Sequence, residues 1–420
     1  MAFHFSRDTK VFMKFKGTVS GSTDALYELP VLDGYSFSQA TNSSEITLSE
    51  AADSAGNSKR GRAMFNDSFA PAEWSFSTYM RPTTSAGGDT FVSNQHAGNG
   101  KKFAIEGPLW AAMSAESYGL AVAATDVQAV ATWEPNVFNF QNSNKVALGV
   151  FDLYFVLGAA KDTATGLYVT GTEGVTVYKI SDCSIGTASI DFDIEGLAQV
   201  AWSGQGKKIK EVTQLKTTVG ATSPAVAGEE STAKGLINEG ITSTSNYIRQ
   251  KLTSLAIEYD VSSATGTGTT VDGEAQMTAD TTYNVVLTGG NISIENNLTY
   301  LTPETLGSVN QPLGHVMGTR SVSGNFTCYL NNAAGGSMDL LEDLHEASDI
   351  ITNSFNMTFS IGGSSNPKVS VALPNCHLEL PTHSIEDVIS VDVNFHALPA
   401  DLSSATASSS ANEMSVTYSS

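Results

Sequence analysis

Phe76-Ser77-Thr78-Tyr79-Met80 returns later in the chain as Phe326-Thr327-Cys328-Tyr329-Leu330. Two further stretches repeat in the same order: residues 151–157 match 355–361, and Asp182-Cys183-Ser184-Ile185 matches Asn375-Cys376-His377-Leu378. The offset between copies changes along the chain because the intervening loops differ in length. Two copies of one unit in a polypeptide favour a subunit that builds rings over an enzyme built around one pocket.

The repeated stretches have the period-two pattern of β-strands. Residues 355, 357, 359 and 361 are Phe, Met, Phe and Ile, while residues 354, 356, 358 and 360 are Ser, Asn, Thr and Ser. Such alternation is typical of antiparallel sheets with one dry and one solvated face. We therefore predict a mainly β protein with two tandem, duplicated sandwiches or flattened barrels.

Helix signals are few, and we predict about one short helix in each unit. Ser337 is placed to cap a helix over 338–349, in which Asp339 lies near the positive end. Pro108 is suited to open a helix through Met113. Both helices would lie between the strand that contains the first repeat and the strand that contains the second.

Domain boundaries are expected where the composition loosens into Thr, Ala, Gly and Ser. The predicted organisation is a first domain over 1–215, a linker over 216–245, a second domain over 246–402 and a Ser-rich flexible tail over 403–420.

The composition limits the possible partners and compartments. The chain has 420 residues, with 22 Lys and Arg against 43 Asp and Glu, a formal net charge of −21. This argues against tight binding of nucleic acid or anionic membranes, which need clustered cations. Three separated cysteines, Cys183, Cys328 and Cys376, are expected to be buried free thiols. The amino terminus has no signal-peptide core, and the longest apolar run, 146–160, is short and interrupted by Asp152, so we expect a soluble protein made in cytoplasm.

No motif supports catalysis, a cofactor or a metal. Gly-x-Ser-x-Gly, the phosphate-binding P-loop and His-Glu-x-x-His are absent from the sequence. The segment from Asp191 resembles the start of a calcium loop, but Trp202 stands where a bidentate Glu is needed. His377, Glu379 and His383 share strand parity, and a solvated sheet face explains them better than a zinc site.

The sharpest basic cluster in this acidic chain is Lys59-Arg60-Gly61-Arg62, within the long segment 42–69. It is either a solvated loop or a contact that docks on an acidic neighbour, and the sequence leaves both open. Nucleic-acid recognition is disfavoured because no aromatic platform accompanies the cluster.

Several longer motifs resemble one family. Phe65-Asn66-Asp67-Ser68, the segment Ala72 to Tyr79, Val200-Ala201-Trp202-Ser203-Gly204, and Asn296 to Pro303 are similar to signatures of the major tail tube proteins of long-tailed siphophages of the T-five-like type. The resemblance covers almost the whole span from Phe3 to Leu402. The resemblance does not extend to the carboxy-terminal immunoglobulin-like decoration domain of the type member, so we expect that domain to be missing, which leaves surface decoration open.

The resemblance implies a non-enzymatic virion protein with two tube domains, three copies of which close a pseudo-sixfold ring. Rings would stack into the tail tube, assembled in the host cytoplasm around a tape-measure protein between a tail-tip initiator and a tail terminator. Phage DNA would pass through without specific binding, and no membrane partner is implied. Segments 42–69 and 299–318 are expected to reach the next ring. The candidate inter-ring contacts are Lys59, Arg60, Arg62, Asn66, Asp67 and Arg320.

The acidic balance suggests a mechanical role, since a lumen rich in Asp and Glu would repel phosphate over a Debye length of ~8 Å and let DNA slide.

Three alternative functions are less well supported by the sequence. The duplication disfavours a secretion-system tube protein, and the missing secretion signal disfavours an adhesin. A β-sandwich carbohydrate-active enzyme would need a pair of carboxylates, which we do not find.

Overall fold

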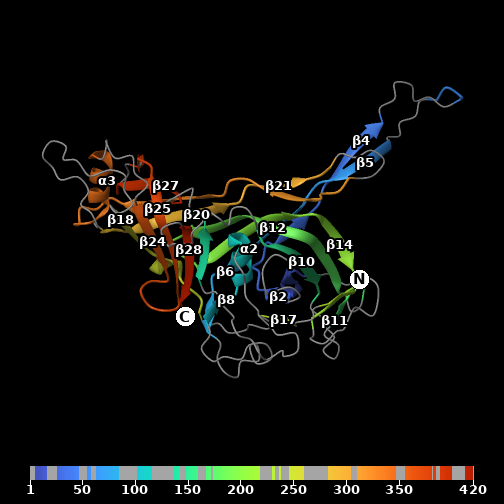
Figure 1. Cartoon of the computed structure of the whole chain (residues 1–420), viewed down its shortest axis with the longest axis horizontal. Helices are drawn as coiled ribbons and strands as arrows, with labels where there is room; N and C mark the ends of the chain where they lie inside the picture. Colours follow the sequence, from blue (N-terminus) through green and yellow to red (C-terminus); the bar gives the residue numbers. More distant parts are fainter. Residues whose placement is uncertain are drawn as a thin grey trace.

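A computed structural model of the chain describes residues 5–16, 26–46, 54–57, 63–84, 102–115, 137–141, 148–158, 167–171, 174–217, 229–231, 236–237, 246–259, 282–303, 310–346, 355–380, 382–384, 388–399 and 412–419. The chain is mainly β, as the alternation predicts. Most of its described strands belong to one large curved sheet, and an arm projects from the body (Figure 1).

The strands up to residue 237 are β1 (Lys10–Lys16), β2 (Leu26–Leu29), β3 (Ser36–Ser38), β4 (Thr41–Ile46), β5 (Ala63–Phe69), β6 (Ala72–Tyr79), β7 (Pro82–Thr84), β8 (Lys102–Ala104), β9 (Val137–Gln141), β10 (Val150–Leu157), β11 (Leu167–Val169), β12 (Thr176–Phe192), β13 (Gln199–Gly206), β14 (Lys208–Val212), β15 (Gln214–Lys216), β16 (Glu229–Ser231) and β17 (Leu236–Ile237). The last two lie within the predicted linker 216–245, where β16 pairs with β15 and β17 pairs with β2.

The later strands are β18 (Ser254–Tyr259), β19 (Thr282–Val285), β20 (Leu287–Glu295), β21 (Leu298–Leu301), β22 (Gly314–Met317), β23 (Ser321–Tyr329), β24 (Phe355–Ile361), β25 (Lys368–Leu378), β26 (Thr382–Ser384), β27 (Ser390–Ala397) and β28 (Asn412–Ser419). The helical elements are α2 (Gly107–Ser114), α3 (Ser337–Glu346) and the 3₁₀ turns η1 (Ser6–Asp8) and η3 (Gln250–Leu252).

The two halves of the chain pair their strands in the same order. In the first half, neighbours run β2, β1, β10, β12, β13, β6 and β3. In the second half, they run β19, β18, β24, β25, β27, β23 and β20. Every one of these pairings is antiparallel. The register shift in β10 against β12 recurs in β24 against β25, with Cys183 opposite Phe151 and Cys376 opposite Phe355.

The same position in each half holds one large side chain and one glycine, on opposite strands. Trp74 lies opposite Gly204, and Gly324 lies opposite Phe395. A Cβ on Gly204 would lie 2.5 Å from a Trp74 ring carbon, and a Cβ on Gly324 would lie 2.6 Å from a Phe395 ring carbon. The two halves therefore fill this volume from opposite strands, which keeps the packing density of the core.

Among the described strands, two ladders join the halves. The end of β12 pairs with β20 over Thr187–Phe192 and Gly290–Glu295. The carboxy-terminal β28 lies between β25 of the second half and β9 of the first. The predicted flexible tail over 403–420 is therefore wrong for residues 412–419, where buried Met414, Val416 and Tyr418 alternate on one face. Residues 403–411 lie outside the described part of the chain.

Both predicted helices are present, each between the expected strands. The buried α2 begins with Pro108 in its first turn and packs on β9 and β12. The α3 helix packs on β19 and is described as far as Glu346, so the predicted residues 347–349 lie beyond the described part. The Ser337 hydroxyl accepts a hydrogen bond from the Asn331 amide (2.9 Å) and donates one to the Tyr329 carbonyl (2.8 Å), so it holds the strand-to-helix loop instead of capping the helix.

One core cluster draws residues from both halves. The Trp110 ring on α2 lies 4.8 Å from the Trp202 ring on β13, and the Phe192 and Phe359 rings stack at 5.1 Å across the halves. The predicted buried free thiols are confirmed at all three cysteines. Among the described helices, none is long and apolar enough to cross a membrane.

Candidate assembly surface

Two hairpins extend from the sheet, one from each half. The first arm, β4 and β5, continues β3 and β6; the second arm, β21 and β22, continues β20 and β23. The arms lie against each other, because the Phe69 amide donates to the Asn310 carbonyl (2.8 Å) and the Asn310 amide donates to the Asp67 carbonyl (3.1 Å). Both run toward the upper right of Figure 1, and the first arm reaches farther from the body. The segments 42–69 and 299–318, selected from the sequence, correspond to these arms.

The candidate contacts occupy different places. Asn66 and Asp67 are exposed on β5, where the Asp67 carboxylate accepts a hydrogen bond from the Ser44 hydroxyl. Lys59, Arg60 and Arg62 lie outside the described residues, in the segment that links β4 to β5.

Arg320, by contrast, lies inside the fold. Its Nε donates to Glu413 Oε2 (2.7 Å), its Nη2 donates to the Gln141 carbonyl (2.6 Å), and its side chain is 1% exposed. The structure therefore does not bring Arg320 to the exposed surface of the arms. Its geometry is that of a structural ion pair between the β28 strand and the base of β23.

The arms expose large apolar side chains that were not selected from the sequence. Those described are Ile46, Met64 and Phe65 on the first arm and Leu301, Leu313 and Val316 on the second. Phe65 is 60% exposed and Leu313 is 66% exposed. Exposed apolar side chains gathered on one feature of a protein indicate a contact surface. In the sequence, this surface is indicated by Met64 and Phe65, two large apolar residues in an otherwise polar hairpin.

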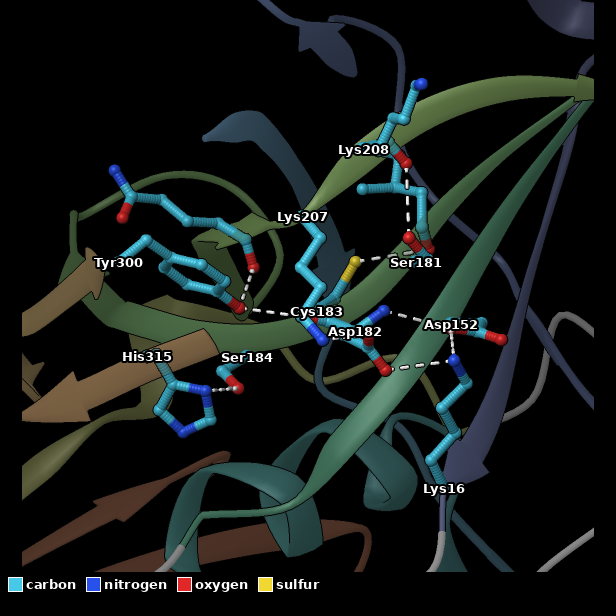
Figure 2. A network of polar contacts seen from close by, with 12 residues as sticks. Lys16, Asp152, Ser181, Asp182, Cys183, Ser184, Lys207, Lys208, Tyr300 and His315 are labelled. Atoms are coloured by element: carbon cyan, nitrogen blue, oxygen red, sulfur yellow. Dashed lines mark hydrogen bonds and ion pairs between the residues drawn. The ribbon is translucent and has the colours of Figure 1, made fainter. Parts of the chain in front are cut away.

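The second arm is fixed to the first half by polar contacts at its base. The Tyr300 hydroxyl lies 2.7 Å from the Asp182 carbonyl and 3.0 Å from the Gln205 carbonyl (Figure 2). His315 Nδ1 lies 3.3 Å from the Ser184 hydroxyl, and its ring packs against Tyr300 at 5.6 Å. Burial lowers the pKa of His315, which favours the neutral ring at pH 7.

Next to these polar contacts lies a network of ion pairs, which accounts for Asp152 in the apolar run 146–160. Buried Asp152 binds Lys16 and Lys179, each at 2.9 Å, and accepts the Asp182 amide at 3.0 Å. Asp182 binds Lys16 and Lys207, each at 2.9 Å. Burial acts to raise the pKa of Asp182, but the hydrogen bonds from Lys207 and Lys16 outweigh it and hold this pKa below its usual value.

Asp182 also has a left-handed backbone, with φ of 51°. It lies between Ile180 and Cys183, where β12 shifts register against β10. The network therefore holds the bulge at which β12 leaves β10 and continues toward β20. The junction between the halves and the base of the second arm are stabilised by the same charged groups.

A continuous solvent-facing sheet face runs across both halves. It follows β27, β23, β20, β12, β13, β6 and β3 in order of pairing. We call the side chains opposite the core on these strands, with β12 taken only over Thr187–Phe192, the polar face. Its acidic members are Glu73, Asp191, Glu295 and Asp392, its other members are mostly Ser, Thr, Asn and Gln, and none of its described members is Lys or Arg.

The comparisons with known proteins agree with this architecture. The phage tail tube protein family matches residues 82–397. The chain is also similar to "Tail tube protein pb6" of Escherichia phage T5, with 28% identity over 406 residues that cover 96% of this chain and 74% of the relative. The structure has a β-rich fold, a continuous polar face and two projecting arms, and the family model matches most of the chain. This chain therefore belongs to the phage tail tube protein family.

Proposed function

We propose that this chain is the structural subunit of a phage tail tube, that it has no enzymatic activity, and that three copies close a pseudo-sixfold ring. The observation that carries the proposal is the identical order of strand pairing in the two halves. Two similar units in one chain make a ring of six from three chains, because head-to-tail contacts between like units close by rotation.

The polar face is the proposed wall of the lumen. Apart from His396, which lies 3.2 Å from Glu379, its described side chains are neutral or acidic, so they offer phosphate groups no lysine or arginine partner. DNA would be repelled from such a wall over a Debye length of ~8 Å and would slide along it.

Adding lysine to the polar face tests this role. Ala201 on β13 and Asn291 on β20 are both exposed. Phage whose tubes carry Ala201→Lys and Asn291→Lys are expected to eject DNA severalfold more slowly at low salt, because each added cation can contact phosphate, and to recover as salt is raised. Ejection is followed by dye fluorescence, with Ala201→Gln and Asn291→Gln as the matched control. Equal ejection rates for the two double variants at low salt would reject a sliding role for this face.

The two arms are the proposed contact between stacked rings. They project from the body and carry exposed apolar side chains. The two strands of the first arm are joined by the segment that holds Lys59, Arg60 and Arg62. Contacts along the tube axis do not close on themselves, so they extend a filament. Apolar contact would supply adhesion, and the basic cluster would fix register against an acidic neighbour.

Reversing the charge of the cluster tests the arm. Arg60→Glu with Arg62→Glu is expected to reduce the length of assembled tubes at least severalfold, while the subunit keeps its folded circular-dichroism spectrum, because both residues lie in a segment joining two exposed strands. Arg60→Lys with Arg62→Lys keeps the charge and is expected to assemble normally. If the glutamate variant forms tubes as long as the wild type, the docking role is wrong.

Other tail proteins complete the proposed assembly. As the family implies, the tube would grow in the host cytoplasm around an extended tape-measure protein, from a tail-tip initiator to a terminator. Negative-stain microscopy of the purified chain tests the central proposal. Hollow rods or rings with a trimeric, near-sixfold outline support it, whereas monodisperse globules under all assembly conditions would reject it.

A further inference from the structure

At the junction between the two halves, β12 pairs with β20 as an antiparallel ladder. In it, Thr187, Ser189 and Asp191 of β12 lie opposite Glu295, Ser293 and Asn291 of β20. The turn that follows β12 is covered by the segment before β18, since the Ala198 amide donates to the Ile248 carbonyl (2.8 Å) and Leu197 bridges to Arg249. Ala198 and Ile248 are both buried at this contact.

The strand registers give the matching positions in the two halves. Pairs Ala72–Gly206 through Tyr79–Gln199 of the first half correspond one by one to pairs Val322–Ala397 through Tyr329–Ser390 of the second. The neighbouring ladders extend this correspondence. Ser189 lies opposite Ala201, and its counterpart Thr382 lies opposite Asp392, the counterpart of Ala201. Likewise, Ser36 opposite Ser75 corresponds to Asn291 opposite Asn325. The counterpart of the β12 edge is therefore the β26 edge, and the counterpart of β20 is β3.

These two counterparts are the open edges of the row of strands that bears the polar face. Among the described residues, β26 pairs only with β27, and β3 pairs only with β6. Unpaired strand edges readily add another strand. The two open edges of one chain, β26 and β3, therefore correspond to β12 and β20, the two strands that pair with each other in the middle of the chain.

Exposure at the open edges supports the same conclusion. Val388 and Ile389 follow β26 and are 57% and 39% exposed, whereas Ala198, the counterpart of Ile389, is 1% exposed. The correspondence of Ile389 and Ala198 is visible in the backbone, because Leu330 donates to the Ile389 carbonyl as Met80 donates to the Ala198 carbonyl. At the other end, Phe5 precedes η1 as Arg249 precedes η3, and Phe5 is 54% exposed. Apolar groups are thus exposed where the internal junction would cover them.

We propose that the β26 edge of one chain pairs antiparallel with the β3 edge of a second copy, in the register of the internal β12–β20 ladder. Thr382 then lies opposite the partner copy's Ser38, His383 opposite Phe37, and Ser384 opposite Ser36. This inference rests on the proposed ring and adds the residues and register that close it. The contact between chains repeats the contact within the chain, so the β26 and β3 edges are both paired and the polar face continues into the next subunit.

Cysteine pairs test the register. Ser38→Cys with Thr382→Cys places two thiols directly opposite each other, and Ser36→Cys with Ser384→Cys does the same two residues along. Opposed Cβ atoms in an antiparallel pair lie near the spacing that a disulfide needs. The native cysteines are buried and contribute little background. On mild oxidation of assembled tubes, both pairs are expected to give covalent ladders that end at the trimer, and each single variant should not.

A slipped pair is the control. Ser36→Cys with Thr382→Cys is diagonal, with Cβ atoms farther apart, and should link with a yield on the order of tenfold lower. Tubes that form while neither matched pair links, or while the slipped pair links as well as the matched ones, overturn the register and leave the tube standing. A wild-type chain that forms neither rings nor tubes rejects the proposed function itself.

Discussion

Arg320→Leu is expected to destabilise the isolated subunit by about 3–5 kcal/mol, the cost of leaving one partner of a buried ion pair alone. The Arg320 guanidinium contacts Glu413 at 2.7 Å and the Gln141 carbonyl at 2.6 Å, and both charged side chains are nearly inaccessible to solvent. The loss would leave the Glu413 carboxylate in a site with low polarity and would loosen β28, which joins the halves. Urea denaturation followed by tryptophan fluorescence measures the change.

The double variant separates charge from packing. Arg320→Met with Glu413→Leu removes both charges and is expected to recover a large part of the lost stability, because apolar replacement of a buried pair is often nearly neutral. Arg249→Leu, at an exposed arginine, is the matched control and should change the free energy of unfolding little. If Arg320→Leu proves as stable as the wild type, Arg320 has no structural role, and a surface contact would again be open.

Glu106→Gln is expected to remove a pH dependence of about 3 kcal/mol from the stability of the subunit. Glu106 is buried before α2, where it accepts hydrogen bonds from the Tyr418 hydroxyl and the Arg81 amide. Burial raises the pKa of this carboxyl from 4.5 to about 7, although those hydrogen bonds and the Arg81 charge act to lower it. The Tyr418 hydroxyl in turn accepts from Trp110 Nε1 at 2.7 Å.

The sign follows from proton binding. Between pH 4.5 and about 7 the folded chain holds a proton on Glu106 that the unfolded chain has lost, so stability falls as pH rises through this range and levels off above it. Unfolding free energies measured by urea at pH 5, 6, 7 and 8 should therefore decline less steeply for Glu106→Gln than for the wild type. Glu73→Gln, on the exposed polar face, is the control. Parallel declines for Glu106→Gln and the wild type would contradict a protonated Glu106.

The acidic network around Asp152 and Asp182 shows where sequence reasoning stops. Asp152 is conspicuous in an apolar run, but nothing in the sequence marks Lys16 and Lys179 as its partners. Only the folded sheet brings the ammonium group of each lysine to 2.9 Å from the Asp152 carboxylate. The arms are similar. Their segments were chosen from the sequence, but the contact of Asn310 with Asp67 and Phe69, and the exposure of Phe65 and Leu313, follow from how the two hairpins lie together.

The sequence by itself determined the mainly β class, several of the strands and the two helices, because period-two alternation and Pro108 are local signals that neighbouring residues set. Only the tertiary structure decided that residues 412–419 form a strand between the halves, that Arg320 is buried against Glu413, and which side chains share the polar face. Those outcomes depend on partners far apart in the chain, such as Arg320 and Glu413 at a separation of 93 residues. Burial and charge pairing select such partners only when the sheet has closed around them.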